Sequence, residues 1–538
     1  MLGATSGLAS AQVWTPIPGA NPAQGQTPTT PASTSSGGNT TNQYTGQPDT
    51  FHGYSNTFTG GVAPPTPGTL VIKLNGKVEV DMNAAWTSVN SSPPGAASVS
   101  AGGVVTPGTA AGNGKVNPVS FGSFFRLYPA VDGMAANGLR YGASVEIREN
   151  FPGSSAQPNV PLTPAPSASG YSSSETLFVR RAFTYLAADN VGIVRFGQTD
   201  GVIGLFDPCI FSAGCWDAGI GNFNGGMIQS QSPGAAVAIP FAWLAQAGAE
   251  YGNTKVVYLS PQFAGLDVGF QYAPSMGNGF SACSTQNGTS NANTSPGTSS
   301  NNVCNASTTG LDPTRWYNQV TVGARYQGVF GPVKMGIYAA YETAGKESGP
   351  FVAAGSLPVY APGPTALAQA TAAALHPNNY RLSAGNVFAY DNLSFVSAAA
   401  YATLTTGLGD VTASIDYIGG ALNGQLAMRP QGGAPEQAIV TGLLLKNGPI
   451  TLGAAIEGVD SQGSGNLTGV SQRREFGVAF GGNYNVAPGL YLVGEYMYQY
   501  RHQGDFDFAN NTAGTPANGL GTRDAKGQGV LFSTVVNW

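Results

Sequence analysis

The residue types best suited to catalysis or metal binding are few and scattered in this chain. Its three histidines, His52, His376 and His502, lie far apart in the sequence. Neither a His-Glu-x-x-His zinc motif nor a Gly-x-Ser-x-Gly nucleophile motif occurs. We therefore predict that the protein is not an enzyme and uses neither a metal nor a cofactor. A barrel enzyme that uses Ser and His is the minor alternative.

The four cysteines form two pairs that are local in the sequence: Cys209 with Cys215, and Cys283 with Cys304. Each pair falls within one expected loop, as disulfides do in proteins of an oxidising compartment. We predict two intraloop disulfides. Four free thiols are the alternative, and metal binding is less favoured because no histidine lies nearby.

The composition departs from that of ordinary globular domains. Only 9% of the 538 residues are charged, and the chain has 77 glycines and 37 prolines. Typical globular proteins have roughly 25% charged residues. No apolar run reaches the length of a transmembrane helix. A net charge of −5 without a basic stripe argues against a nucleic-acid partner.

The N-terminal part divides into two segments. Residues 1–11 resemble the end of a secretory signal, with Ala9-Ser10-Ala11 as a small-residue cleavage site; an ordinary terminus is the alternative. Residues 12–68 are rich in Pro, Thr, Ser, Gly and Asn, so we expect a disordered extension.

Residues 69–538 repeat one unit: a strand-length stretch that alternates apolar with polar residues, then a turn or loop. In the first stretch one face carries Ile72, Leu74, Val78, Val80 and Met82. The other face carries Lys73, Asn75, Lys77, Glu79, Asp81 and Asn83. Successive side chains of a strand point to opposite sides, so this pattern predicts a strand with one apolar and one polar face.

Sixteen such stretches are expected to be strands. They are 69–86, 119–128, 138–150, 175–187, 191–198, 253–260, 265–273, 316–327, 330–342, 393–404, 410–418, 436–445, 450–459, 473–484, 489–500 and 527–538. One expected turn lies at Asp132-Gly133. Short and long connections alternate, as in a transmembrane β-barrel with short periplasmic turns and long external loops. To close the barrel, residues 535–538 should pair near residues 69–75.

Several segments resemble the trimeric general porins of Gram-negative bacteria. They are Leu74–Glu79, Asn137–Gly142, Arg180–Phe183, Gly192–Gly197 and Tyr258–Gly265. They occur in the family's order over roughly 470 residues. The extension, the long loops 274–312 and 343–388 and the cysteine pairs depart from the family pattern.

The resemblance implies an all-β, 16-stranded antiparallel barrel in the bacterial outer membrane, with both termini on the periplasmic side. It implies a homotrimer surrounded by outer-membrane lipid and lipopolysaccharide. The function implied is passive diffusion of ions and small hydrophilic solutes through a water-filled channel. The loop at 199–252 would fold inward and narrow this channel.

The resemblance also implies a charged constriction with an acidic loop facing a basic wall. The acidic residues would be Asp200, Asp207 and Asp217. The basic residues would be Lys77, Arg126, Arg140, Arg180 and Arg195. The adjacent Arg180 and Arg181 cannot both face the lumen. We assign Arg180 inward and Arg181 outward, where a subunit interface would shelter it. Such groups should be hydrated and act on passing ions; a structural ion-pair network in the wall is the alternative.

Two other functions fit a barrel of this kind. One is a barrel plugged by its own loops or extension that acts as a surface or structural protein. The other is a substrate-selective porin, whose channel would carry an aromatic track; the pattern shows no inward-facing aromatic row. Because both charge signs occur, the resemblance implies no particular ion preference.

Overall fold

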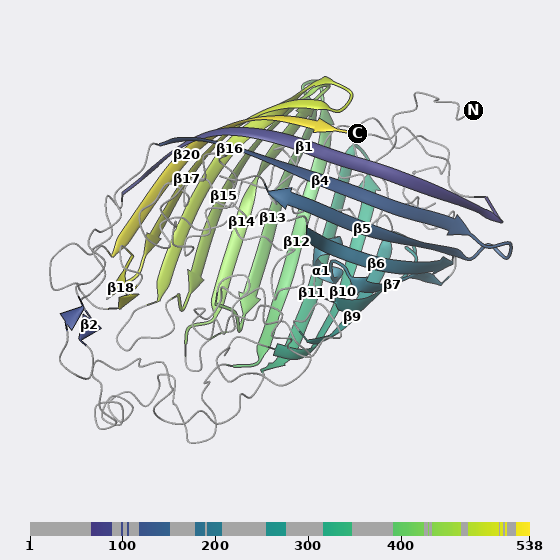
Figure 1. Cartoon of the computed structure of the whole chain (residues 1–538), viewed down its shortest axis with the longest axis horizontal. Helices are drawn as coiled ribbons and strands as arrows, with labels where there is room; N and C mark the ends of the chain where they lie inside the picture. Colours follow the sequence, from purple (N-terminus) through teal and green to yellow (C-terminus); the bar gives the residue numbers. More distant parts are fainter. Residues whose placement is uncertain are drawn as a thin grey trace.

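Sixteen long strands form a closed antiparallel barrel (Figure 1). The computed structural model describes residues 66–88, 98–99, 105–106, 118–150, 178–188, 191–206, 254–275, 316–346, 391–423, 429, 433–463, 472–504, 506–508, 512–513 and 523–538. The barrel strands are β1 (Thr69–Thr87), β4 (Val119–Met134), β5 (Arg140–Asn150), β6 (Phe178–Ala188), β7 (Gly192–Gln198), β8 (Thr254–Leu259), β9 (Leu266–Ser275), β10 (Trp316–Phe330), β11 (Val333–Lys346), β12 (Leu393–Thr406), β13 (Gly409–Gly420), β14 (Glu436–Asn447), β15 (Ile450–Ser461), β16 (Arg473–Ala487), β17 (Leu490–His502) and β20 (Asp524–Asn537).

The elements outside the barrel sheet are small. Strands β2 (Ser98–Val99) and β3 (Val105–Thr106) pair with each other, as do β18 (Phe506–Asp507) and β19 (Thr512–Ala513). A single turn of helix, α1 (Val202–Phe206), follows β7. Among the described residues, no helix has the length and apolar character needed to cross a membrane.

The sixteen expected strands are confirmed, and their connections alternate as predicted. Short turns join β4 to β5, β6 to β7, β8 to β9, β10 to β11, β12 to β13, β14 to β15 and β16 to β17. The intervening connections are longer and leave from the opposite ends of these strands. In an outer-membrane barrel the short turns mark the periplasmic end.

One expected turn was wrong. Asp132 and Gly133 continue β4, where they pair with Val71 and Leu70 of β1. The turn lies further on, at residues 135–139. Strand β4 was expected to end at residue 128. The first residues of β1 pair with β4 beyond that point, and this pairing keeps residues 129–134 extended. Asp132 therefore points into the barrel instead of lying in a turn.

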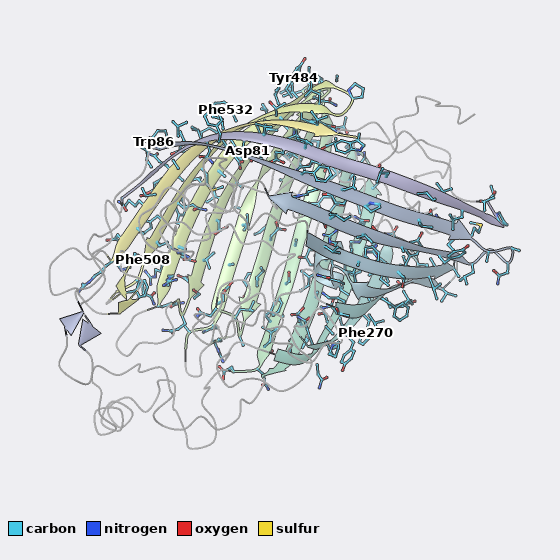
Figure 2. All side chains as sticks on the ribbon, in the orientation of Figure 1. Asp81, Trp86, Phe270, Tyr484, Phe508 and Phe532 are labelled. Carbon is cyan, nitrogen blue, oxygen red and sulfur yellow. The ribbon has the colours of Figure 1, made fainter. Side chains whose placement is uncertain are left out.

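Alternation along each strand separates an inner from an outer face. On β15, Leu452 and Ile456 are exposed, whereas Ala455 and Glu457 between and beyond them are buried. Trp86, Phe270, Tyr484 and Phe532 lie on the outer surface (Figure 2). Large apolar side chains on the outside are what a hydrocarbon environment requires.

The barrel closes between its first and last strands. Lys77 pairs with Asn537, and Glu79 pairs with Val535. Gly76 and Trp538 exchange two backbone hydrogen bonds, at 3.0 and 3.1 Å. The closing pairs therefore lie further along β1 than residues 69–75, because the first part of β1 pairs with β4 alone.

The indole ring of Trp538 completes this closure. It lies over Gly76, where an added Cβ would overlap the ring. It also stacks on Phe125 of β4, with ring centroids 6.3 Å apart. The last residue of the chain thus contacts both β1 and β4.

Candidate functional site

Basic residues line the inner face of the barrel's first strands. Lys77 on β1, Arg126 on β4, Arg140 on β5 and Arg195 on β7 are all buried and occupy inward positions of the alternation. The side chain of Arg180 lies outside the described residues. Four of the expected basic residues therefore share one wall.

Each of these charges sits among carboxylates. Lys77 Nζ lies 2.7 Å from Glu79, and both side chains are fully buried. Asp81, two residues further along the same face, accepts a hydrogen bond from Ser533 Oγ at 2.5 Å. The Lys77–Glu79 pair is a contact of the kind that an ion-pair network in the wall would contain, and the basic wall of the constriction stays a prediction.

A second pair lies near the periplasmic turns. Arg140 Nη2 is 3.0 Å from Asp132 Oδ2, and Tyr185 OH donates to Asp132 Oδ1 at 2.7 Å. Asp132 and Arg140 are 0% exposed and Tyr185 is 1% exposed. This cluster joins β4, β5 and β6 through side chains in addition to their backbone pairing.

The expected orientation of Arg181 was wrong. Arg181 points inward, where its Nη2 lies 2.6 Å from Asp200 and its Nε lies 3.5 Å from Glu146. Arg181 follows the regular alternation of β6, in which Tyr185 and Ala187 are also buried. A bulge lies beside it: Glu146 pairs with Arg181, but Ile147 pairs with Val179, so Arg180 is an extra residue. Arg181 therefore no longer indicates a subunit interface.

The segment after β7 turns into the barrel. All five residues of α1 are buried, and α1 packs against β9, β10 and β11. Asp200, the first expected acidic residue, contacts the wall directly through Arg181 instead of facing it across an opening. Asp207, Asp217 and the four cysteines lie outside the described residues.

Tyrosines also occupy the inner face, although no inward-facing aromatic row was expected. Besides Tyr185, Tyr338 OH shares a hydrogen bond with Ser397 Oγ at 2.9 Å. Tyr401 OH accepts a hydrogen bond from Gln327 at 3.1 Å. Their polar ends bind the wall itself, so these tyrosines link strands of the wall: β4 with β6, β11 with β12, and β10 with β12.

Sequence reasoning missed the carboxylates of the wall. Alternation had already placed Glu79 and Asp81 on the face of Lys77, so a signal for them was available. Asp132 was assigned to a turn, and the partner of Glu146, Arg181, was expected to face outward. The described residues contain no group of three or more His, Cys, Asp or Glu that could hold a metal ion.

Comparison with known proteins identifies one family. The family model for Gram-negative porins matches residues 84–504, which is most of the chain. No curated protein matches the sequence significantly.

Solved structures with a similar fold are distant in sequence. An anion-selective porin from Comamonas acidovorans has 12% identity and a TM-score of 0.41, over 87% of this chain and 100% of that one. OmpT, an outer membrane protein of Vibrio cholerae, has 11% identity and a TM-score of 0.41, over 88% of this chain and 99% of that one. A mutant of the Rh. blastica porin has 10% identity and a TM-score of 0.38, over 86% and 100% of the two chains. Similarity at this level transfers no functional detail.

Proposed function

Because this chain belongs to the Gram-negative porin family and forms an outer-membrane channel, we propose that ions and small hydrophilic solutes diffuse through it past a constriction built by the segment 199–252. The observation that carries this proposal is the path of residues 199–206. They leave β7, pair with Arg181 through Asp200 and place α1 inside the barrel. A segment that enters the lumen at this point narrows it.

The wall beside this segment has a mixed charge. Lys77, Arg126, Arg140, Arg181 and Arg195 supply the positive groups, with Glu79, Asp81, Asp132 and Glu146 among them. Close pairs such as Lys77–Glu79 largely cancel each other's field at a distance. Arg181–Asp200, 2.6 Å apart, is also a close pair, but it joins the wall to the loop. We propose that its charges act on passing ions, because removing either one leaves the other in excess beside the constriction.

Charge removal at this pair should shift ion selectivity in opposite directions. Arg181→Gln leaves the carboxylate of Asp200 in excess and should raise the cation-to-anion permeability ratio by about two-fold or more. Asp200→Asn leaves the guanidinium in excess and should lower this ratio. The reversal potential of single channels in a salt gradient measures both effects.

The control is an exposed ion pair on the outer surface. Arg474 and Asp460 lie 3.8 Å apart with side chains 77% and 53% exposed, so Arg474→Gln and Asp460→Asn should keep the wild-type reversal potential. If Arg181→Gln and Asp200→Asn also keep it, the segment does not form the constriction.

Three further features complete the proposal. The protein assembles as a homotrimer, as the porin resemblance implies, and its apolar outer face contacts outer-membrane lipid and lipopolysaccharide. Residues 1–11 belong to a secretory signal, and residues 12–68 are an extension that precedes the barrel. Arg181 offers no support for the trimer, because it faces the lumen.

We also propose the disulfides Cys209–Cys215 and Cys283–Cys304, on the basis of their local spacing. The first pair would stiffen the constriction segment shortly after α1. Mass spectrometry of unreduced peptides should find each cysteine linked to its near neighbour. Linkage between Cys209 or Cys215 and the other two cysteines would contradict the placement of residues 199–252 inside the barrel.

A further inference from the structure

Helix α1 rests in a shallow trough in the inner wall. Gly269 of β9 pairs with Gly323 of β10, and Gly323 pairs with Ala340 of β11. Three neighbouring strands therefore present small residues in one line. An added Cβ would lie 2.7 Å from Val202 Cγ1 at Gly269 and 2.9 Å from the same atom at Gly323. The side chain of Val202 thus occupies the space that two ordinary residues would fill.

Glycine in the middle of a strand has a cost that calls for a compensating role. It weakens the strand because its backbone loses more conformational entropy on folding and because it has no side chain to pack. A glycine in a strand often marks a close approach of another segment. Gly269 and Gly323 are paired in register on the adjacent strands β9 and β10. The close approach here is that of α1.

Polar contacts fix α1 along the trough. Gln271, two residues after Gly269 on the same face, is fully buried, and its Oε1 accepts a hydrogen bond from the Val202 backbone N–H at 3.0 Å. At the other end of α1, the ring of Phe206 lies 4.8 Å from the guanidinium carbon of Arg325. A cation over an aromatic ring at this distance is attracted to it.

Arg325 is itself held rigidly. Its Nε and Nη2 donate to the two carboxylate oxygens of Asp267 at 3.2 and 2.9 Å. This two-point geometry fixes the plane of the guanidinium. Phe206 therefore packs on a fixed surface and not on a mobile side chain.

A helix of one turn has little stability of its own, because nucleation of a helix is unfavourable. The position of α1 must therefore come from the wall. We propose that Gly269, Gln271, Gly323 and Arg325 are positioning residues that seat α1 and thereby set where the constriction segment crosses the channel. This inference rests on the proposed function, since it assigns the support of the same constriction.

The test adds methyl groups to the trough and then, in a further variant, removes the methyl groups of Val202 that they contact. The double variant Gly269→Ala/Gly323→Ala places two methyl groups against Val202 Cγ1 and should push α1 off the wall toward the lumen. Single-channel conductance should fall about two-fold, because the opening narrows. Adding Val202→Ala removes the obstructed methyl group and should restore conductance. Gly458→Ala is the control, because an added Cβ there meets nothing within 4 Å.

A second measurement separates this inference from the proposed constriction. Hydrogen exchange of a peptide covering residues 199–206 reports whether α1 has left the wall, since the Val202 N–H is bound to buried Gln271. Faster exchange in the double variant, reversed by Val202→Ala, supports the proposed seat, meaning the positioning of α1 by these wall residues. Wild-type exchange in a folded double variant overturns it. Faster exchange with unchanged conductance supports the seat and overturns the constriction.

Discussion

Replacing Asp132 by Ala should destabilise the barrel by about 3–5 kcal/mol, the usual effect of removing one partner of a buried ion pair. Asp132 and Arg140 are both 0% exposed, and the carboxylate also accepts the hydrogen bond of Tyr185. The variant therefore removes the compensating charge from a buried guanidinium and the acceptor from a buried hydroxyl. The free energy of unfolding in urea, followed by the loss of the compact form on unheated gels, measures this effect.

The matched control is Asp460→Ala. Asp460 pairs with Arg474 on the exposed outer face, and exposed ion pairs contribute about 0–1 kcal/mol. Equal stability of the two variants would show that the Asp132 cluster does not hold β4, β5 and β6 together. In that case Arg140 would again be a candidate for the hydrated pore wall.

Gly76→Ala should destabilise the barrel by about 1–3 kcal/mol, the usual cost of overpacking a filled site. The new Cβ overlaps the indole ring of Trp538, which must move away from Phe125 and from the backbone of Gly76. The two hydrogen bonds between Gly76 and Trp538 are then strained or lost. Urea unfolding measures the change.

Two further variants test whether the effect comes from the ring. In a Trp538→Ala background the cost of Gly76→Ala should nearly disappear, because nothing remains to be displaced. Gly494→Ala is the control, since its added Cβ would meet Phe532 at an ordinary 3.7 Å. A full cost of Gly76→Ala in the Trp538→Ala background would mean that the glycine is needed for its backbone and not for the indole.

The strands and the inward position of Lys77 could be predicted because alternation has a period of two and β1 follows it without interruption. Arg181 was misplaced because only one of the adjacent Arg180 and Arg181 was expected to face the lumen and the choice fell on Arg180, whereas the alternation that buries Tyr185 and Ala187 also turns Arg181 inward. The pairing of Lys77 and Arg140 with carboxylates was given only as an alternative. Alternation tells which face a side chain is on, but not how closely that face is covered.

The seat of α1 was out of reach of sequence reasoning. It depends on the register that brings Gly269 opposite Gly323, and the two glycines belong to strands joined by a long loop. Neither glycine is distinctive among 77. The trough exists only once the strands are paired.

The closure between β1 and β20 also bears on how the protein folds. Every other strand pair in the barrel joins neighbours in chain order, whereas Lys77 and Asn537 come from opposite ends of the chain. Contacts between such distant residues form slowly because a long loop must close first. Until they form, β1 and β20 are free edges that can pair with another molecule. Folding therefore depends on whether β1 pairs with β20 before either free edge pairs with another molecule, which would lead to aggregation.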